Sequence, residues 1–126
     1  DGTDLTLIAY SGMVPVCLAV RKALATRGVS IEVVDLVSLQ PLDTAAILAS
    51  VRKTGRAVIV EEACRTGGVG AEVAALIAAE ALDALEAPLR RVAAADVPIP
   101  SSIELEKAVL PGTEDVVRAV RDVMTW

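Results

Sequence analysis

The sequence contains no histidine and no phenylalanine, and aromatic residues make up only 2% of its 126 residues. Without histidine the chain lacks the commonest general base, the commonest metal ligand and the central member of a catalytic triad. Two cysteines, Cys17 and Cys64, are too few for a disulfide framework, and no Cys/His or clustered-carboxylate pattern predicts a metal site. We therefore expect this domain not to be an enzyme by itself.

Long apolar runs are also missing. The longest strictly apolar run is Val73–Ala79, far short of the ~20 residues that a membrane-spanning helix needs. The net charge of −5 disfavours nucleic acid and favours a basic protein partner. The start Asp1-Gly2-Thr3-Asp4 has neither an initiator Met nor a signal peptide. We expect the chain to be a fragment of a longer protein. We also expect a reducing compartment, and we favour the bacterial cytosol over the mitochondrial matrix.

Small apolar residues are what the sequence has in surplus. Hydrophobic residues make up 54% of the chain although aromatics are nearly absent. Such a surplus either fills a core or covers an interface, and monomeric proteins rarely expose large apolar patches. The composition therefore predicts contact with a partner.

Four β-branched runs alternate with helical patterns, which predicts one α/β domain with a parallel sheet covered by helices on both faces. We expect Ser11 and Asp43 to cap helices and Gly28 and Gly55 to end them. The predicted strands are Leu5–Tyr10, Ile31–Leu36, Ala57–Val60 and Leu89–Ala94. The first predicted helix follows Ser11, with Met13, Val14, Cys17, Leu18 and Leu24 inward. The second begins after Asp43. Three more are predicted over Val69–Leu85, near Leu105 and over Thr113–Met124.

A glycine-rich segment, Gly67-Gly68-Val69-Gly70, lies between a predicted strand and a helix, where glycines can cradle a phosphate. The dinucleotide fingerprint fails because Val73 occupies the place of its third glycine, and Glu72 would repel an anion. The segment is better interpreted as tight-turn glycines that let the helix approach its sheet.

The acidic pair Glu61-Glu62 ends the third predicted strand, where α/β proteins build ligand crevices. Neighbouring strand residues point to opposite faces, so the two carboxylates are not a catalytic pair. We expect a structural or interface role for them, with Arg65, Arg56 or a neighbouring subunit as the partner.

Several strings, taken in order along the chain, carry a resemblance to a known family. They are Ala9–Val14, Val33–Leu36 with Gln40–Asp43, Val60–Glu72, and Asp96–Pro100 with Leu105-Glu106. The sequence resembles the C-terminal domain of the beta subunit of thiamin-diphosphate-dependent 2-oxo acid dehydrogenases of the pyruvate, branched-chain and acetoin types. Transketolase and deoxyxylulose-phosphate synthase share that fold but match these strings less well.

The resemblance implies a three-layer α/β/α domain, like the transketolase C-terminal domain, with parallel strands in the spatial order 2-1-3-4. In the family an antiparallel edge strand precedes the first parallel one, and the chain begins just after that point. We therefore expect an unpaired edge on the Ile31–Leu36 strand and more self-association than in a version extended upstream.

The resemblance also implies that thiamin diphosphate and Mg²⁺ are held by an alpha subunit and the beta subunit's N-terminal domain, and that no residue here binds either. This domain would support a heterotetramer with a second beta subunit and dock the basic binding domain of the acyltransferase. The candidate contacts are Asp83, Glu86 and the terminal carboxylate of Trp126.

The sequence departs from its relatives at three places near expected subunit contacts: Cys64 replaces a frequent proline, Val69 a phenylalanine and Ser101 an aromatic residue. Two alternatives stay open. One is a flavodoxin-like small-molecule-binding module, disfavoured by its lack of a phosphate-cradling first loop. The other is the C-terminal domain or scaffold of another transketolase-like enzyme.

Overall fold

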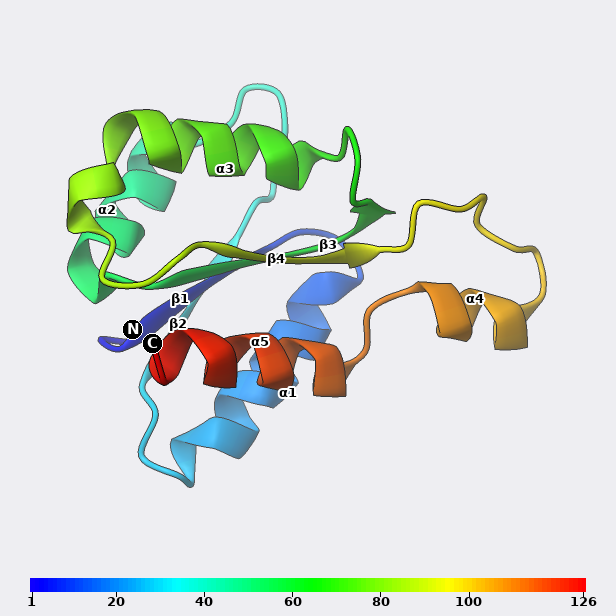
Figure 1. The fold of residues 1–126 in the computed structure, drawn as a ribbon, viewed down its shortest axis with the longest axis horizontal. Helices are drawn as coiled ribbons and strands as arrows, with labels where there is room; N and C mark the ends of the chain where they lie inside the picture. The colour runs from blue at the N-terminus through cyan, green and yellow to red at the C-terminus, as the bar shows by residue number, and fades with distance from the viewer.

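The four predicted strands form one parallel sheet in the computed structural model, which describes residues 1–126 (Figure 1). The sheet has the spatial order β2-β1-β3-β4, as expected. β1 pairs in parallel with both β2 and β3, and β3 pairs in parallel with β4. The strands are β1 (Leu5–Ala9), β2 (Ile31–Asp35), β3 (Ala57–Cys64) and β4 (Arg90–Ala94).

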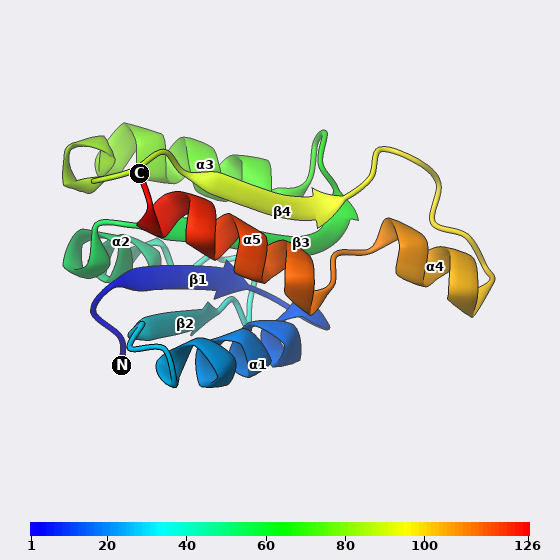
Figure 2. The same cartoon turned by 60° about the horizontal axis from the view of Figure 1, so that its bottom comes forward.

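Helices cover both faces of the sheet and give the three-layer α/β/α architecture (Figures 1 and 2). α1 (Met13–Ala25) and α5 (Thr113–Met124) pack on one face, and α2 (Thr44–Thr54) and α3 (Val69–Glu80) pack on the other. A 3₁₀ turn (Leu82–Ala84) follows α3, and the short α4 (Ile103–Val109) precedes α5. None of these helices is long and apolar enough to cross a membrane.

Three strand ends differ from the sequence prediction by one residue, and two element ends differ by more. β3 continues to Cys64 instead of ending at Val60, because a shift in register between Val60 and Cys64 lets it stay paired with β4. α3 ends at Glu80 instead of Leu85, because Ala81 leaves the helical region with φ −145° and a separate 3₁₀ turn follows.

The first helix also differs in two details. Ser11 does not cap it: Ser11 has a positive φ of 53°, and the N-cap is Gly12, which has no side chain to offer. Leu18 is 46% exposed, because neighbouring Cys17 takes the inward position. By contrast, Asp43 accepts a hydrogen bond from the Ala46 amide and Gly55 adopts the left-handed conformation at the end of α2, as predicted.

A buried polar network joins β1, β2 and α2. The hydroxyl of Thr6 lies 2.8 Å from the hydroxyls of both Ser50 and Thr54. Ser50 donates to Glu32 at 2.6 Å, and Lys53 pairs with the same Glu32 carboxylate at 2.7 Å. Burial alone would raise the pKa of Glu32, but the hydrogen bonds from Lys53 and Ser50 outweigh it and hold this pKa below its usual value.

Replacing Glu32 with glutamine is expected to flatten the acid side of the stability curve. A carboxylate whose pKa is lowered by folding stabilises the native state above its unfolded pKa of about 4.3 and loses this effect as the pH falls through the native value. The wild-type chain should therefore lose stability more steeply than Glu32→Gln below about pH 4. Urea midpoints measured across this range check the difference, and parallel curves would contradict it.

Candidate functional site

The carboxyl half of β3 holds a fully buried acidic side chain. Glu61 is 0% exposed. Its Oε1 accepts a hydrogen bond from Nη2 of Arg91 at 2.6 Å, within an ion pair that links β3 to β4. Its Oε2 accepts from the Gly70 amide at 2.8 Å and from the Tyr10 hydroxyl at 3.3 Å. One carboxylate therefore joins β3, β4, the first turn of α3 and the residue that follows β1.

The glycines around the start of α3 make room for that carboxylate. A Cβ at Gly68 would lie 2.8 Å from Oε2 of Glu61, and a Cβ at Gly70 would lie 2.8 Å from its Cδ. Gly67 adopts a φ of +75°, which L residues rarely do. The helix N-terminus that could have bound a phosphate is thus occupied by the protein's own anion.

Burial raises the pKa of Tyr10 to about 12, and the Glu61 charge adds to the effect. Tyr10 therefore stays protonated at neutral pH and acts as a donor to Glu61. Burial likewise raises the pKa of the Cys17 thiol to about 12, so this cysteine is a packed side chain and not a nucleophile.

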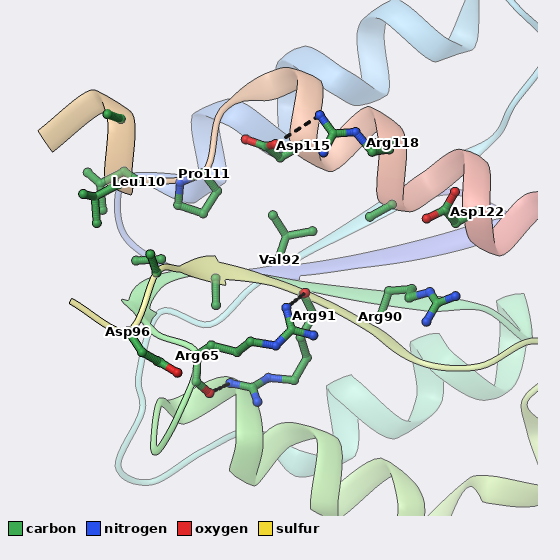
Figure 3. A pocket seen from close by; sticks show the side chains of 16 residues that line it. Arg65, Arg90, Arg91, Val92, Asp96, Leu110, Pro111, Asp115, Arg118 and Asp122 are labelled. Carbon is green, nitrogen blue, oxygen red and sulfur yellow. Dashed lines mark hydrogen bonds and ion pairs between the residues drawn. The ribbon is translucent and has the colours of Figure 1, made fainter. Parts of the chain in front are cut away.

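Of the partners expected for the acidic pair, the two arginines were wrong. Glu61 pairs with Arg91, whereas Arg56 pairs with Glu86 and Arg65 makes no ion pair. Arg65 and Arg91 each donate a side-chain hydrogen bond to the other's backbone carbonyl, as Figure 3 shows. Glu62 points to the opposite face of the sheet, where its carboxylate lies against Gly12 at the start of α1. The structure therefore separates Glu61 from Glu62.

Sequence reasoning missed Arg91 and Tyr10 as the side chains that bind Glu61. Arg91 lies beside Ile59 in the register of β3 and β4, on the face that Glu61 also uses. The available signal was the pair Arg90-Arg91 in an otherwise apolar strand, because the arginine that points into the protein requires an acidic partner.

An open hollow of about 700 Å³ runs along β4 and α5 (Figure 3). Charged side chains of both signs line it, among them Arg90, Arg118, Asp115 and Asp122. Arg118 and Asp115 pair at 3.5 Å. Nowhere in the chain do three or more acidic, cysteine or histidine side chains gather as a metal site would require.

The remaining candidates gather near the amino end of β4. Asp83 lies in the 3₁₀ turn, and Glu86 pairs with Arg56 at 2.9 Å while its side chain stays 60% exposed. Trp126 is 75% exposed. With Glu86, it lines a hollow of about 370 Å³ whose other walls are mostly apolar: Ala78, Leu82, Leu85, Ala87, Pro88 and Leu89.

Comparison with known proteins identifies a matching family and several relatives of the chain. Residues 1–116 match the family described as transketolase, C-terminal domain. The mitochondrial pyruvate dehydrogenase E1 component subunit beta-1 of Arabidopsis thaliana is 47% identical over 119 residues, which are 94% of this chain and 33% of that protein. The pyruvate dehydrogenase E1 component subunit beta of Staphylococcus epidermidis is 46% identical over 126 residues, 100% of this chain and 38% of that protein. The chain spans about a third of the length of these relatives.

Solved structures agree on the fold. A split-gene transketolase, described as an inactive beta4 tetramer, has a TM-score of 0.86 and 32% identity, covering 99% of this chain and 40% of that chain. A 2-oxoglutarate:ferredoxin oxidoreductase from Magnetococcus marinus has a TM-score of 0.67 with 98% of this chain and 18% of that chain covered. At 13% identity, the second likeness shows the fold alone.

Proposed function

The chain belongs to the transketolase C-terminal domain family, and from this premise we propose that it is the assembly and docking domain of the beta subunit of a 2-oxo acid dehydrogenase. Residues 1–126 would form one domain of a longer subunit. The complete enzyme would oxidatively decarboxylate a 2-oxo acid and transfer the acyl group to lipoamide, and the isolated domain would be inactive. The observation that carries the proposal is the 46% identity to a pyruvate dehydrogenase beta subunit along the whole chain. Because the chain matches this family, we reject the flavodoxin-like alternative.

The parent enzyme would use thiamin diphosphate and Mg²⁺, which we place outside this domain. Thiamin diphosphate stabilises the carbanion formed when a 2-oxo acid loses carbon dioxide. The residues present do not fit it: the Gly70 amide at the start of α3 already donates to Glu61, and the nearby glycines enclose that carboxylate. We therefore assign Glu61, and with it Glu62 and Arg65, to holding the domain together or to subunit contacts.

The proposed partners are an alpha subunit, a second beta subunit in a heterotetramer, and the binding domain of the acyltransferase. Exposed apolar side chains support a role in assembly, because surfaces of this kind mark protein interfaces. They are Leu18, Val37, Leu39, Leu82, Val97, Ile99, Ile103, Leu105 and Trp126. We propose the bacterial cytosol as the location, although the similar proteins include mitochondrial as well as bacterial ones.

The apolar hollow beside Trp126 is the proposed docking site for the acyltransferase. Leu82 is 64% exposed there, and Glu86 keeps an exposed carboxylate at its margin. Asp83, in the adjoining 3₁₀ turn, adds negative charge nearby. An apolar centre with an acidic rim suits a partner that presents aliphatic side chains flanked by lysine or arginine.

Glu86→Gln and Trp126→Ala are each expected to weaken binding of the acyltransferase binding domain by about tenfold, and the wild-type affinity should fall as salt is added. Isothermal titration measures both effects. Arg56→Gln is the matched control, because it breaks the same ion pair but leaves the Glu86 carboxylate in place. Wild-type affinity in both test variants would overturn the proposed docking site, and absence of any binding would overturn the docking role.

A further inference from the structure

The outer edge of β4 borders the open hollow of about 700 Å³ described above. β4 is the last strand of the sheet and pairs only with β3. The continuous stretch Arg90–Asp96 lines one side of the hollow, and side chains of α5 line the other (Figure 3). At about 3.3 Å per residue, this stretch is about 20 Å long, which is the length of a typical strand. The hollow is therefore long enough to hold one more strand beside β4.

The backbone of β4 directs unpaired hydrogen-bonding groups into this hollow. The Ala94 carbonyl accepts a hydrogen bond from the Arg65 amide at 3.1 Å, so the backbone groups of Ala94 face β3. Because successive residues of a strand in a parallel pair direct these groups to opposite edges, those of Ala93 face the hollow. Ala95 faces the same way, since its amide donates to the Val109 carbonyl at 3.4 Å. Ala93 thus offers one donor and one acceptor to a further strand.

The carboxyl half of this edge carries none of the features that commonly block strand pairing. Natural edge strands are protected by charged side chains, by proline or by bulges. The stretch Val92–Ala95 contains no charged residue and no proline. The register shift between the two strands adds residues to β3 and not to β4. The edge therefore remains competent to pair.

The charges around the hollow select the kind of segment that it fits. Arg65 and Arg90 are both exposed and form no ion pair. Two of the three acidic side chains that line the hollow already have partners within the molecule, which leaves Asp122. Two free cations against one free acid favour an acidic occupant. Cross-strand pairing would bring such an acid opposite Arg90.

We propose that the β4 edge binds an extended acidic segment of another polypeptide, which adds to the sheet as a fifth strand. The Ala93 backbone would supply the central hydrogen bonds, and Arg90 and Arg65 would pair with acidic side chains of the segment. A second copy of this chain fits less well, because it would bring the same two cations to the contact. This hollow shares no lining residue with the one beside Trp126, so the proposal adds a second surface to the proposed docking function.

A synthetic peptide in which valine and glutamate alternate over seven residues, with both ends blocked, tests the edge directly. Added to the isotope-labelled 126-residue chain, it should shift the amide resonances of Arg91 and Ala93 in NMR spectra. It should bind about tenfold more tightly than the peptide with lysine in place of glutamate. The net charge of the chain is −5, so its overall field favours the lysine peptide. A preference for glutamate would therefore report the cations at the edge.

Two N-methylated forms of the glutamate peptide test strand pairing without altering the protein. Alternate amides of an added strand face β4 and solvent in turn. Methylating one set of alternate amides should therefore weaken binding by about tenfold or more, and methylating the other set should leave it nearly unchanged. Equal binding of the two methylated forms, or no binding of the unmethylated peptide, would overturn the proposal.

Variants of the chain locate the contact. Ala93→Pro should weaken binding by about tenfold or more and still fold, because proline is tolerated where an edge N–H faces solvent. Arg90→Glu should abolish the preference for glutamate, whereas Arg121→Glu, on α5 but outside the hollow, is the matched control and should not. Circular dichroism verifies folding, and the methylated peptides decide the matter if Ala93→Pro unfolds. Peptide shifts confined to β2, or a wild-type dimer that Ala93→Pro dissociates in sedimentation velocity, would also contradict the proposal.

Discussion

Replacing Arg91 with methionine is expected to lower the free energy of unfolding by about 3–5 kcal/mol. The Glu61 carboxylate is completely buried, and the guanidinium of Arg91, 2.6 Å away, is the positive charge that pairs with it. Methionine retains much of the apolar stem of the side chain but leaves the buried charge uncompensated. Urea unfolding at neutral pH, followed by circular dichroism, measures the loss as a shift in midpoint.

Two controls isolate the effect of the charge. Adding Glu61→Gln to Arg91→Met removes the uncompensated carboxylate and should recover part of the lost stability. Arg118→Met deletes an exposed pair, since Arg118 and Asp115 are 3.5 Å apart with both side chains largely in solvent. That change should cost less than about 1 kcal/mol. If Arg91→Met costs no more than Arg118→Met, the buried pair does not hold β3, β4 and α3 together.

Replacing Gly70 with alanine is expected to destabilise the chain by about 1–3 kcal/mol. The direction is unusual, because alanine inside a helix normally stabilises it relative to glycine by about 0.5–1 kcal/mol. At this position the new Cβ would collide with the Glu61 carboxylate and lie 3.0 Å from Cγ2 of Ile59. The carboxylate would be pushed away from the Gly70 amide and from Arg91.

Gly67→Ala provides the comparison, because nothing lies within 4 Å of its Cβ position while its φ of +75° disfavours an L residue. This substitution should lower the free energy of unfolding by about 1–2 kcal/mol through backbone strain alone. The diagnostic result is the rescue: Glu61→Ala combined with Arg91→Met removes the colliding atoms and should reduce the cost of Gly70→Ala but leave that of Gly67→Ala unchanged. A stabilising Gly70→Ala substitution would contradict the account of the glycines.

The regular elements were predictable because local chemistry determines them. β-branched runs predicted each strand, and Asp43 and Gly55 marked the ends of α2 by capping and by the left-handed conformation. The order of the strands came from the family resemblance. Leu18 was misplaced because two adjacent apolar residues both fit helical spacing roughly, and only packing against the sheet selected Cys17.

The partner of Glu61 was not predictable from local patterns. Which arginine meets a buried carboxylate depends on the register between β3 and β4, and this register shifts between Val60 and Cys64. Arg65 is nearer in sequence, but Arg91 lies on the face that Glu61 uses. The hollow beside Trp126 likewise requires the chain end to return to the 3₁₀ turn, a contact between residues distant in the sequence.

The central claim is that this chain serves as the C-terminal domain of a 2-oxo acid dehydrogenase beta subunit. The most direct measurement exchanges the matching third of the Staphylococcus epidermidis pyruvate dehydrogenase beta subunit for residues 1–126, a replacement at 46% identity. The chimera is expected to assemble with its alpha subunit into a heterotetramer and to decarboxylate pyruvate, whereas residues 1–126 alone remain inactive. A folded chimera that fails to assemble with the alpha subunit would contradict the account.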